Sequence, residues 1–187
     1  MRQKVKMSRR VYTYYSVDAS IMVKIKDSFY EDVAQSVWDE LVRLVEEDRW
    51  KIFDLVAKEV HGNRADEWFK RNPKAIIQFD SIFNDYFNRF MVELEYYGLK
   101  MFDPNKEKDA RDPFVVALAL MLEKRSISNL RIRTGNVICC VLTNEVLKED
   151  KTNIPSVCAH YNLPCMNLLD FMRHHGWKLS LTVKNPE

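Results

Sequence analysis

Four acidic residues that lie far apart along the chain stand beside apolar segments. Asp18 follows the run "YYSV", Glu145 follows "VICCVLTN", Asp112 precedes the apolar run 114–122, and Glu59 lies within "LVAKEV". Carboxylates that gather in one place stay ionised when a cation is present, and hard oxygen ligands favour Mg²⁺ or Mn²⁺ over zinc. Such an ion can orient a water, lower its pKa and stabilise the charge that develops on a phosphodiester. If these carboxylates converge, the sequence predicts metal-dependent phosphodiester hydrolysis.

Each carboxylate also has an ordinary structural explanation. Asp112 followed by Pro113 is typical of a helix N-cap with proline in the first turn. Asp18 at a strand end fits an Asx turn, Glu145 fits the first turn of a helix, and Glu59 fits plain surface exposure. Spacing along the chain cannot show convergence, so the catalytic and the structural interpretations both stay open.

The elements that would position these residues alternate between strands and helices. The run "VYTYYSV" is rich in aromatic and β-branched residues and predicts a buried strand that ends near Asp18, and "NVICCVLT" predicts a second buried strand. The apolar run after Asp112 predicts a buried helix packed on the sheet. This alternation at both ends of the chain predicts an α/β fold with a central, mostly parallel sheet flanked by helices. In such sheets a ligand lies at the carboxyl ends of the strands, where Asp18 and Glu145 are expected.

The middle of the chain is expected to be all-helical. Apolar residues at helical spacing predict a helix over 29–48, and the second half of 50–62 is expected to be helical with Glu59 near its end. A short helix ending at Pro73 comes next. A long helix is then predicted over 74–98, with an aromatic stripe formed by Phe79, Phe83, Tyr86, Phe87 and Phe90. A stripe at this spacing is typical of core packing, and a platform for stacking bases is the alternative.

The last part of the chain again alternates short elements. We expect a helix over 154–164 with Pro155 in its first turn, a short strand at Cys165 and Met166, and a helix over 167–176. A final edge strand is predicted over 177–181.

The composition places the chain among globular proteins. Its 187 residues, 47% of them hydrophobic, fit a single domain over 1–187 with a basic N-terminal tail at 1–10. The net charge of +2 neither requires nor excludes nucleic acid, because the position of the charge matters. The four cysteines lack the spacing of a zinc site and are expected to be buried free thiols. No apolar run could span a membrane and no signal peptide is recognisable, so we expect a soluble, cytoplasmic protein.

The order of these motifs resembles that of a known family. "VDAS", "KEV", "RDPFVVALAL" and "VLTNE", taken in this order, resemble the PIN-domain nucleases. The closing segment "IPSVCAHYNLPCMNLLDFMRHHGWKL" resembles, more closely, a PIN-like branch catalogued as a domain of unknown function in prokaryotes. The resemblance covers residues 14–181, nearly the whole chain. It implies a PIN-like fold in which the predicted helix 74–98 is a long insertion.

The resemblance also implies roles for individual residues. Asp18 and Glu59 would be the first and second acidic metal ligands. Asp112 would be the third, with Asp109 as a competing candidate. Glu145 would take the place of the family's fourth carboxylate.

Three further residues are expected to support these ligands. Thr143 fills the place of the threonine that precedes the fourth carboxylate in the family. Ser20 and Asn144 would hold the ligands or a metal-bound water through hydrogen bonds.

The family implies cleavage of RNA with Mg²⁺ or Mn²⁺ as cofactor. Many members are toxins of toxin–antitoxin pairs, which implies an antitoxin partner and a homodimer. Two alternatives come from other classes. One is a PIN-like scaffold that binds RNA or protein without catalysis. The other is an aspartate-nucleophile phosphatase, which would need a second aspartate where this chain has Ser20.

Overall fold

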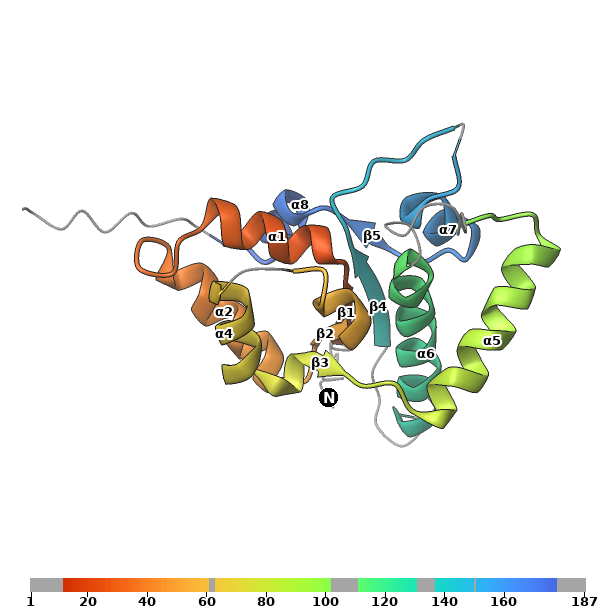
Figure 1. Cartoon of the computed structure of the whole chain (residues 1–187), viewed down its shortest axis with the longest axis horizontal. Coiled ribbons are helices and arrows are strands. Elements are labelled where there is room, and N and C mark those ends of the chain that lie inside the picture. Colours follow the sequence, from red (N-terminus) through yellow and green to blue (C-terminus); the bar gives the residue numbers. More distant parts are fainter. Residues whose placement is uncertain (1–11, 61–62, 102–110, 131–136, 150, 178–187) are drawn as a thin grey trace, which may run out of the picture.

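The core of the protein is a five-stranded parallel sheet. The computed structural model describes residues 12–60, 63–101, 111–130, 137–149 and 151–177. The strand order is β3-β2-β1-β4-β5, and every neighbouring pair is parallel (Figure 1). The strands are β1 Tyr12–Val17, β2 Trp50–Phe53, β3 Ile76–Ile77, β4 Val137–Leu142 and β5 Cys165–Met166. The predicted α/β fold with a parallel central sheet is therefore confirmed.

Helices cover both faces of this sheet. Figure 1 shows α5, α6 and α7 on one side of the sheet and α1, α2, α4 and α8 on the other. Successive side chains of a strand point to opposite faces, so the two layers of helices bury consecutive residues such as Tyr15 and Ser16 of β1. The helices are α1 Ala19–Ser28, α2 Gln35–Glu46, α3 Asp54–Ala57, α4 Asn63–Arg71, α5 Ser81–Tyr96, α6 Asp112–Leu130, α7 Ile154–His160 and α8 Leu168–His174.

The central strand β1 shows how this arrangement is fixed. The ring of Tyr15 packs edge-on against Phe171 of α8, with 4.9 Å between ring centroids. The next residue, Ser16, faces the other way, and its hydroxyl donates a 2.7 Å hydrogen bond to the carbonyl of Val115 in α6. This bond places the first turns of α6 beside the last residues of β1.

Helix α6 lies between the sheet and α5. Its residues 115–121 are all buried, as expected for a segment that is apolar on every side. Figure 1 shows that α6 runs opposite to β4, so its first residue lies at the edge where the strands end. Asp112 is that first residue.

The strands β1 and β4 end at the same level. Their register runs from Tyr12 opposite Val137 to Val17 opposite Leu142. The two residues that follow, Asp18 and Thr143, therefore emerge side by side at one edge of the sheet. We call this edge, formed by the residues that follow the strands, the carboxyl edge.

The expectation of an all-helical middle is wrong, because β2 and β3 lie within it. A segment of four residues such as "WKIF" is as short as one helical turn, and periodicity cannot separate the two forms. The long helix is also shorter than the predicted 74–98. Pro73–Ala75 form a 3₁₀ turn and β3 follows, and α5 begins at Ser81 because the Asp80 side chain caps it by accepting a hydrogen bond from the Phe83 backbone N–H.

Other boundaries also differ from the prediction. Helix α1 follows Asp18 directly and was not expected, and α2 begins at Gln35, later than the predicted 29. Helix α3 ends at Ala57, so Glu59 lies in the turn that follows it. Helix α7 ends at His160, before the predicted 164.

The aromatic stripe of α5 packs mainly into the core, as its spacing predicts. Phe83 and Phe90 are buried, and the ring of Phe87 stacks on Phe114 of α6 with centroids 4.1 Å apart. Phe79 precedes the helix and is 45% exposed. The free thiols of Cys139, Cys140 and Cys158 are buried as expected, and Cys165 is partly buried.

Some predictions concern residues outside the described ranges. These are the basic tail 1–10, Asp109, and residues 178–181 of the predicted edge strand. Among the helices that the structure describes, none combines the length and the apolar character needed to cross a membrane.

Candidate functional site

Asp18 is the best-defined polar residue at the carboxyl edge. It is 8% exposed, and its backbone N–H donates to the carbonyl of Leu142 at 2.9 Å. Its carboxylate does not cap α1, although Asp18 occupies the N-cap position. Instead Oδ2 accepts hydrogen bonds from Ser20 Oγ at 2.5 Å and from Thr143 Oγ1 at 2.8 Å. Two hydroxyls from distant parts of the sequence therefore fix the orientation of this carboxylate.

Asn144 joins three segments at the same edge. Its backbone N–H donates to Ser20 Oγ, and its side-chain amide donates to the Ser20 carbonyl, each at 3.0 Å. Its amide oxygen accepts from the backbone N–H of Leu168, the first residue of α8, at 3.3 Å. The three residues expected to support the ligands, Ser20, Thr143 and Asn144, thus form one network around Asp18, and their relation to a metal stays a prediction.

Glu145 follows this network but uses its carboxylate elsewhere. Its backbone N–H donates to Thr143 Oγ1 at 3.1 Å, and its Oε2 accepts from the backbone N–H of Ile154 at 3.0 Å. The carboxylate thus supports the first turn of α7. Glu145 does not lie in the first turn of a helix, as its structural interpretation expected, because residues 143–148 form an irregular segment.

Asp18 and Glu145 both act on the thiol of Cys165 in β5. The Cys158 thiol donates a hydrogen bond that lowers the pKa of Cys165, while burial and the negative charges of Glu145 and Asp18 act in the opposite direction. The two carboxylates therefore both disfavour the thiolate form of Cys165.

Glu59 has a cation as its neighbour. Its Oε1 lies 3.2 Å from Nη1 of Arg111, and the two side chains are 29% and 39% exposed. Arg111 directly precedes Asp112, so this ion pair brings Glu59 to the head of α6. The hydrogen bond between Ser16 and Val115 in turn brings the head of α6 to the end of β1.

The structure brings the four predicted carboxylates to one edge of the sheet but does not assemble them into one group. The four carboxylates all belong to segments at the carboxyl edge. Within the described ranges, however, no group of three or more His, Cys, Asp or Glu side chains is placed to hold a metal ion. The structure brings Asp18 together with its hydroxyl partners and brings Glu59 together with Arg111.

Asp54 is a further carboxylate at this edge that the sequence analysis missed. It follows β2, the neighbour of β1, and Ser16 pairs with Lys51 in their register. Its Oδ2 lies 3.5 Å from Lys58 Nζ, whereas its Oδ1 is buried without a hydrogen-bond partner among the described residues. The signal was available, because "WKIFD" repeats the pattern of an apolar strand followed by aspartate seen in "YYSVD".

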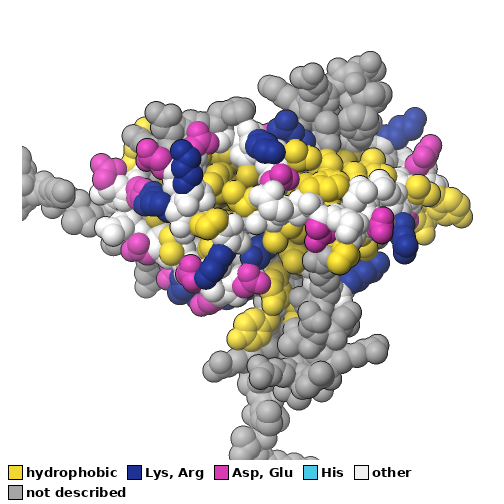
Figure 2. Space-filling view, turned by 60° about the horizontal axis from the view of Figure 1, so that its bottom comes forward, with side chains coloured by type: hydrophobic (Ala, Val, Ile, Leu, Met, Phe, Trp, Pro, Cys, Tyr) yellow, Lys and Arg dark blue, Asp and Glu magenta, His cyan; other side chains and the backbone are white. Residues whose placement is uncertain are grey.

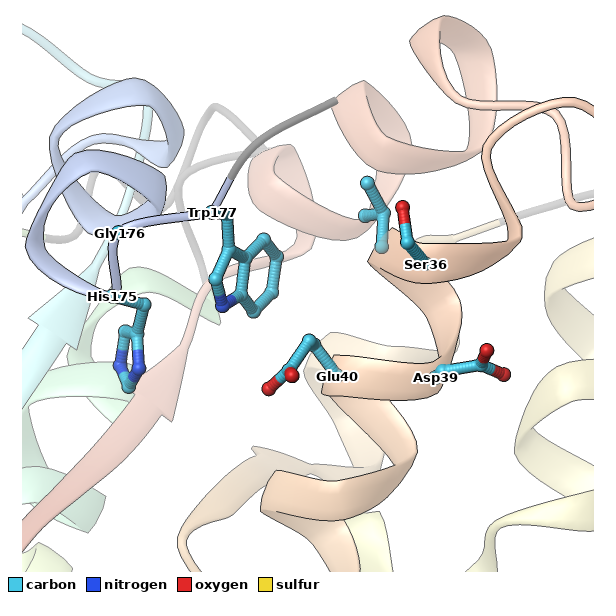
Figure 3. A pocket seen from close by; sticks show the side chains of 7 residues that line it. Ser36, Asp39, Glu40, His175, Gly176 and Trp177 are labelled. Carbon is cyan, nitrogen blue, oxygen red and sulfur yellow. The ribbon is translucent and has the colours of Figure 1, made fainter. Parts of the chain in front are cut away.

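A separate hollow lies between α2 and the turn after α8. It has a volume of about 360 Å³, and Figure 3 shows Ser36, Asp39 and Glu40 on α2 and His175 and Trp177 on the turn. The His175 ring is hydrogen-bonded to Tyr15 OH at 2.8 Å. Burial, helped by the charge of Arg49, lowers the pKa of His175 to about 4. This hollow contains none of the predicted carboxylates and belongs to the α8 side of β1.

Comparison with known proteins identifies a family. The family model described as Domain of unknown function (DUF4411) matches residues 15–179. The matched region includes the whole carboxyl edge, from Asp18 to Glu145. No curated protein and no solved structure matches the chain at a significant level.

Proposed function

The chain belongs to the Domain of unknown function (DUF4411) family, and we propose that this member is an Mg²⁺- or Mn²⁺-dependent ribonuclease with a PIN-like fold. It hydrolyses phosphodiester bonds of RNA at the carboxyl edge of the sheet. The parallel sheet, with β1 at its centre and Asp18 at the end of β1, supports this proposal. In this interpretation α5 is an insertion into a minimal PIN domain. The protein acts in the cytoplasm as the toxin of a toxin–antitoxin pair, and an antitoxin protein is its partner.

The environment of Asp18 is the observation that carries the proposal. A buried charge is normally paired with an opposite charge or bound to a metal. Lys51, which is 5% exposed, follows this rule through its 2.5 Å contact with Asp48. Asp18 is as deeply buried, but its partners within the described residues are the neutral hydroxyls of Ser20 and Thr143. A bound cation would supply the missing positive charge.

The donor atoms at the edge suit a hard cation. Carboxylate oxygens are the ligands that Mg²⁺ and Mn²⁺ prefer, and no sulfur or imidazole is needed. Asp18 would be the main ligand, with Asp112, Glu59 and Glu145 as the further acidic ligands and the buried Oδ1 of Asp54 as an additional donor. When bound, the ion would supply a water of lowered pKa and a positive charge beside the scissile phosphate.

The remaining groups at the edge have roles that follow from their contacts. Ser20 and Thr143 both donate to Asp18 Oδ2 and so orient this carboxylate. Asn144 keeps Ser20 in place through two hydrogen bonds. The planar guanidinium of Arg111 suits a phosphate oxygen, and it lies at the same edge because it pairs with Glu59.

A specific observation favours a second candidate, a scaffold that binds RNA or protein without catalysis. Glu59 is neutralised by Arg111, and the described residues contain no group of three ligands. A site that had lost its metal would need such an internal cation.

The test uses the full-length protein, a labelled single-stranded RNA and Mn²⁺. Cleavage is expected in Mn²⁺, no cleavage is expected in EDTA, and Asp18→Asn should remove activity while the matched change Asp39→Asn, on α2, should not. Calorimetric titration of Mn²⁺ separates the two candidates, because a ribonuclease takes up the ion and a scaffold does not. Cleavage that survives both Asp18→Asn and Asp112→Asn would refute the ribonuclease.

A further inference from the structure

The outer face of α5 carries a regular stripe of exposed residues. Ile82, Asp85, Arg89, Val92 and Tyr96 follow one another at spacings of three and four, which are the spacings of the a and d positions of a coiled coil. The three apolar members are 63%, 68% and 82% exposed, and the two charged members are also exposed. Large apolar side chains grouped in this way on a surface usually mark an interaction site.

The opposite face of the same helix is buried, so the stripe is held facing outward. Phe83, Phe90 and Leu94 are its buried residues, and α5 packs on α6. In Figure 1 α5 lies at one end of the molecule, with α6 on one side and no labelled element beyond it. Figure 2 shows hydrophobic and charged side chains interspersed at this end of the molecule. Within the part of the chain that the structure describes, neither Asp85 nor Arg89 forms an ion pair.

The order of residues in the stripe is complementary to itself. Its first four members, from Ile82 to Val92, are apolar, acidic, basic and apolar, and their centre lies at position 87; Tyr96 lies beyond this symmetric part of the stripe. In an antiparallel pair of helices each a position faces a d position of the other helix. Ile82 then faces the partner's Val92, and Asp85 faces the partner's Arg89. A parallel pair would instead place like charges opposite one another.

We propose that the stripe is the interface of a homodimer, in which the α5 helices of two copies pack antiparallel about a two-fold axis. Two-fold symmetry repeats each contact, so the interface contains two apolar layers and, between them, two pairs of opposite charge. The apolar layers supply the association energy, and the charges fix orientation and register. A second copy is the occupant that this order of residues fits.

The test is sedimentation equilibrium of the full-length protein and of charge-reversed variants. The wild type is expected to form dimers. Asp85→Arg or Arg89→Asp alone places like charges opposite one another twice, so each should raise the dimer Kd about tenfold or more. The double variant Asp85→Arg with Arg89→Asp should return the Kd to within about threefold of wild type, because the swapped charges are again complementary. Because Asp85 and Arg89 are also four residues apart on one helix, circular dichroism is recorded for every variant. Restoration of the Kd at unchanged helix content shows that the two residues face each other across the interface.

Matched controls separate the interface from a general effect of charge. Asp32→Arg changes the net charge as much as Asp85→Arg does but lies in the turn before α2, so it should leave the Kd unchanged. Val92→Asp should give monomers with the circular dichroism spectrum of the wild type. The proposal is overturned if the wild type stays monomeric up to about 100 μM, or if the double variant dimerises no better than the single ones.

Discussion

Asp18 and Glu59 were both predicted as metal ligands, and the structure gives them opposite surroundings. Asp18 is buried, and the hydrogen bonds to its carboxylate come from the hydroxyls of Ser20 and Thr143. Glu59 is partly exposed and has the guanidinium of Arg111 at 3.2 Å. Asp18 has no positively charged partner among the described residues, whereas Glu59 already has one.

This difference teaches that position at a sheet edge does not by itself decide what a carboxylate does. The surroundings of Asp18 are assembled from segments more than a hundred residues apart in sequence and are tied by several hydrogen bonds. The surroundings of Glu59 include an ion pair between two long, partly exposed side chains. The first region is preorganised, whereas the second can rearrange at little cost.

The largest expected difference between Asp18 and Glu59 is in how their substitution changes the response of the free energy of unfolding to Mn²⁺. If Asp18 holds the ion, Mn²⁺ at about a hundred times its Kd should raise the free energy of unfolding by about 2.7 kcal/mol. Asp18→Asn should abolish this gain. The same variant should be at least as stable as wild type in EDTA, because it removes a buried charge without a cationic partner. Chemical denaturation with and without Mn²⁺ measures both effects.

Glu59→Gln is the matched variant in this experiment. It should lower stability slightly in EDTA, because it breaks an ion pair that is already in place. In EDTA, Asp18→Asn is thus expected to be more stable than Glu59→Gln. If Mn²⁺ raises the free energy of unfolding of Asp18→Asn as much as that of wild type, the ion binds elsewhere and the burial of Asp18 has another cause.

A smaller effect is expected from Thr143→Val. This variant keeps the shape of the side chain and removes the hydroxyl that donates to Asp18 Oδ2 and accepts from the Glu145 backbone N–H. Loss of a group that orients a metal ligand typically weakens metal affinity by about 10- to 100-fold. Calorimetric titration of Mn²⁺ measures the change. Thr152→Val, in the segment before α7, is the control and should bind Mn²⁺ as wild type does; equal affinities for all three proteins would contradict the role given to Thr143.

The difference between the two regions also explains what sequence could and could not predict. The runs "YYSV" and "VICCVL" are long enough to be recognised as strands, and parallel strands end at one edge, so the neighbourhood of Asp18 and Thr143 was predictable. The partner of Glu59 was not predictable. Its pairing with Arg111 depends on where α3 ends and how the following turn directs the side chain, and neither follows from periodicity.

Short elements account for most of the remaining differences. β2 and β3 are four and two residues long. Segments this short cannot show a hydrophobic periodicity that would distinguish a strand from a helical turn. Missing β2 also hid Asp54, because a residue is recognised as lying at a strand end only after the strand is recognised. The signal that fixed the start of α5 was the capping aspartate Asp80, which marks a helix start more sharply than the aromatic spacing does.

The smallest expected effect addresses the second region directly. A double-mutant cycle with Glu59→Gln and Arg111→Gln should give a coupling energy of about 0.5 kcal/mol in EDTA, as is usual for a partly exposed ion pair. If Glu59 becomes a ligand when the ion binds, its carboxylate turns from Arg111 toward the metal, and the coupling should fall close to zero at saturating Mn²⁺. Chemical denaturation of the four proteins in both conditions measures the cycle. A coupling that Mn²⁺ leaves unchanged would mean that Glu59 keeps its arginine, and the ligand set would then have to be completed by Asp112, Glu145 or Asp54. This measurement therefore decides whether Glu59 replaces the Arg111 guanidinium by the metal ion, in contrast to Asp18, which has no cationic partner to replace among the described residues.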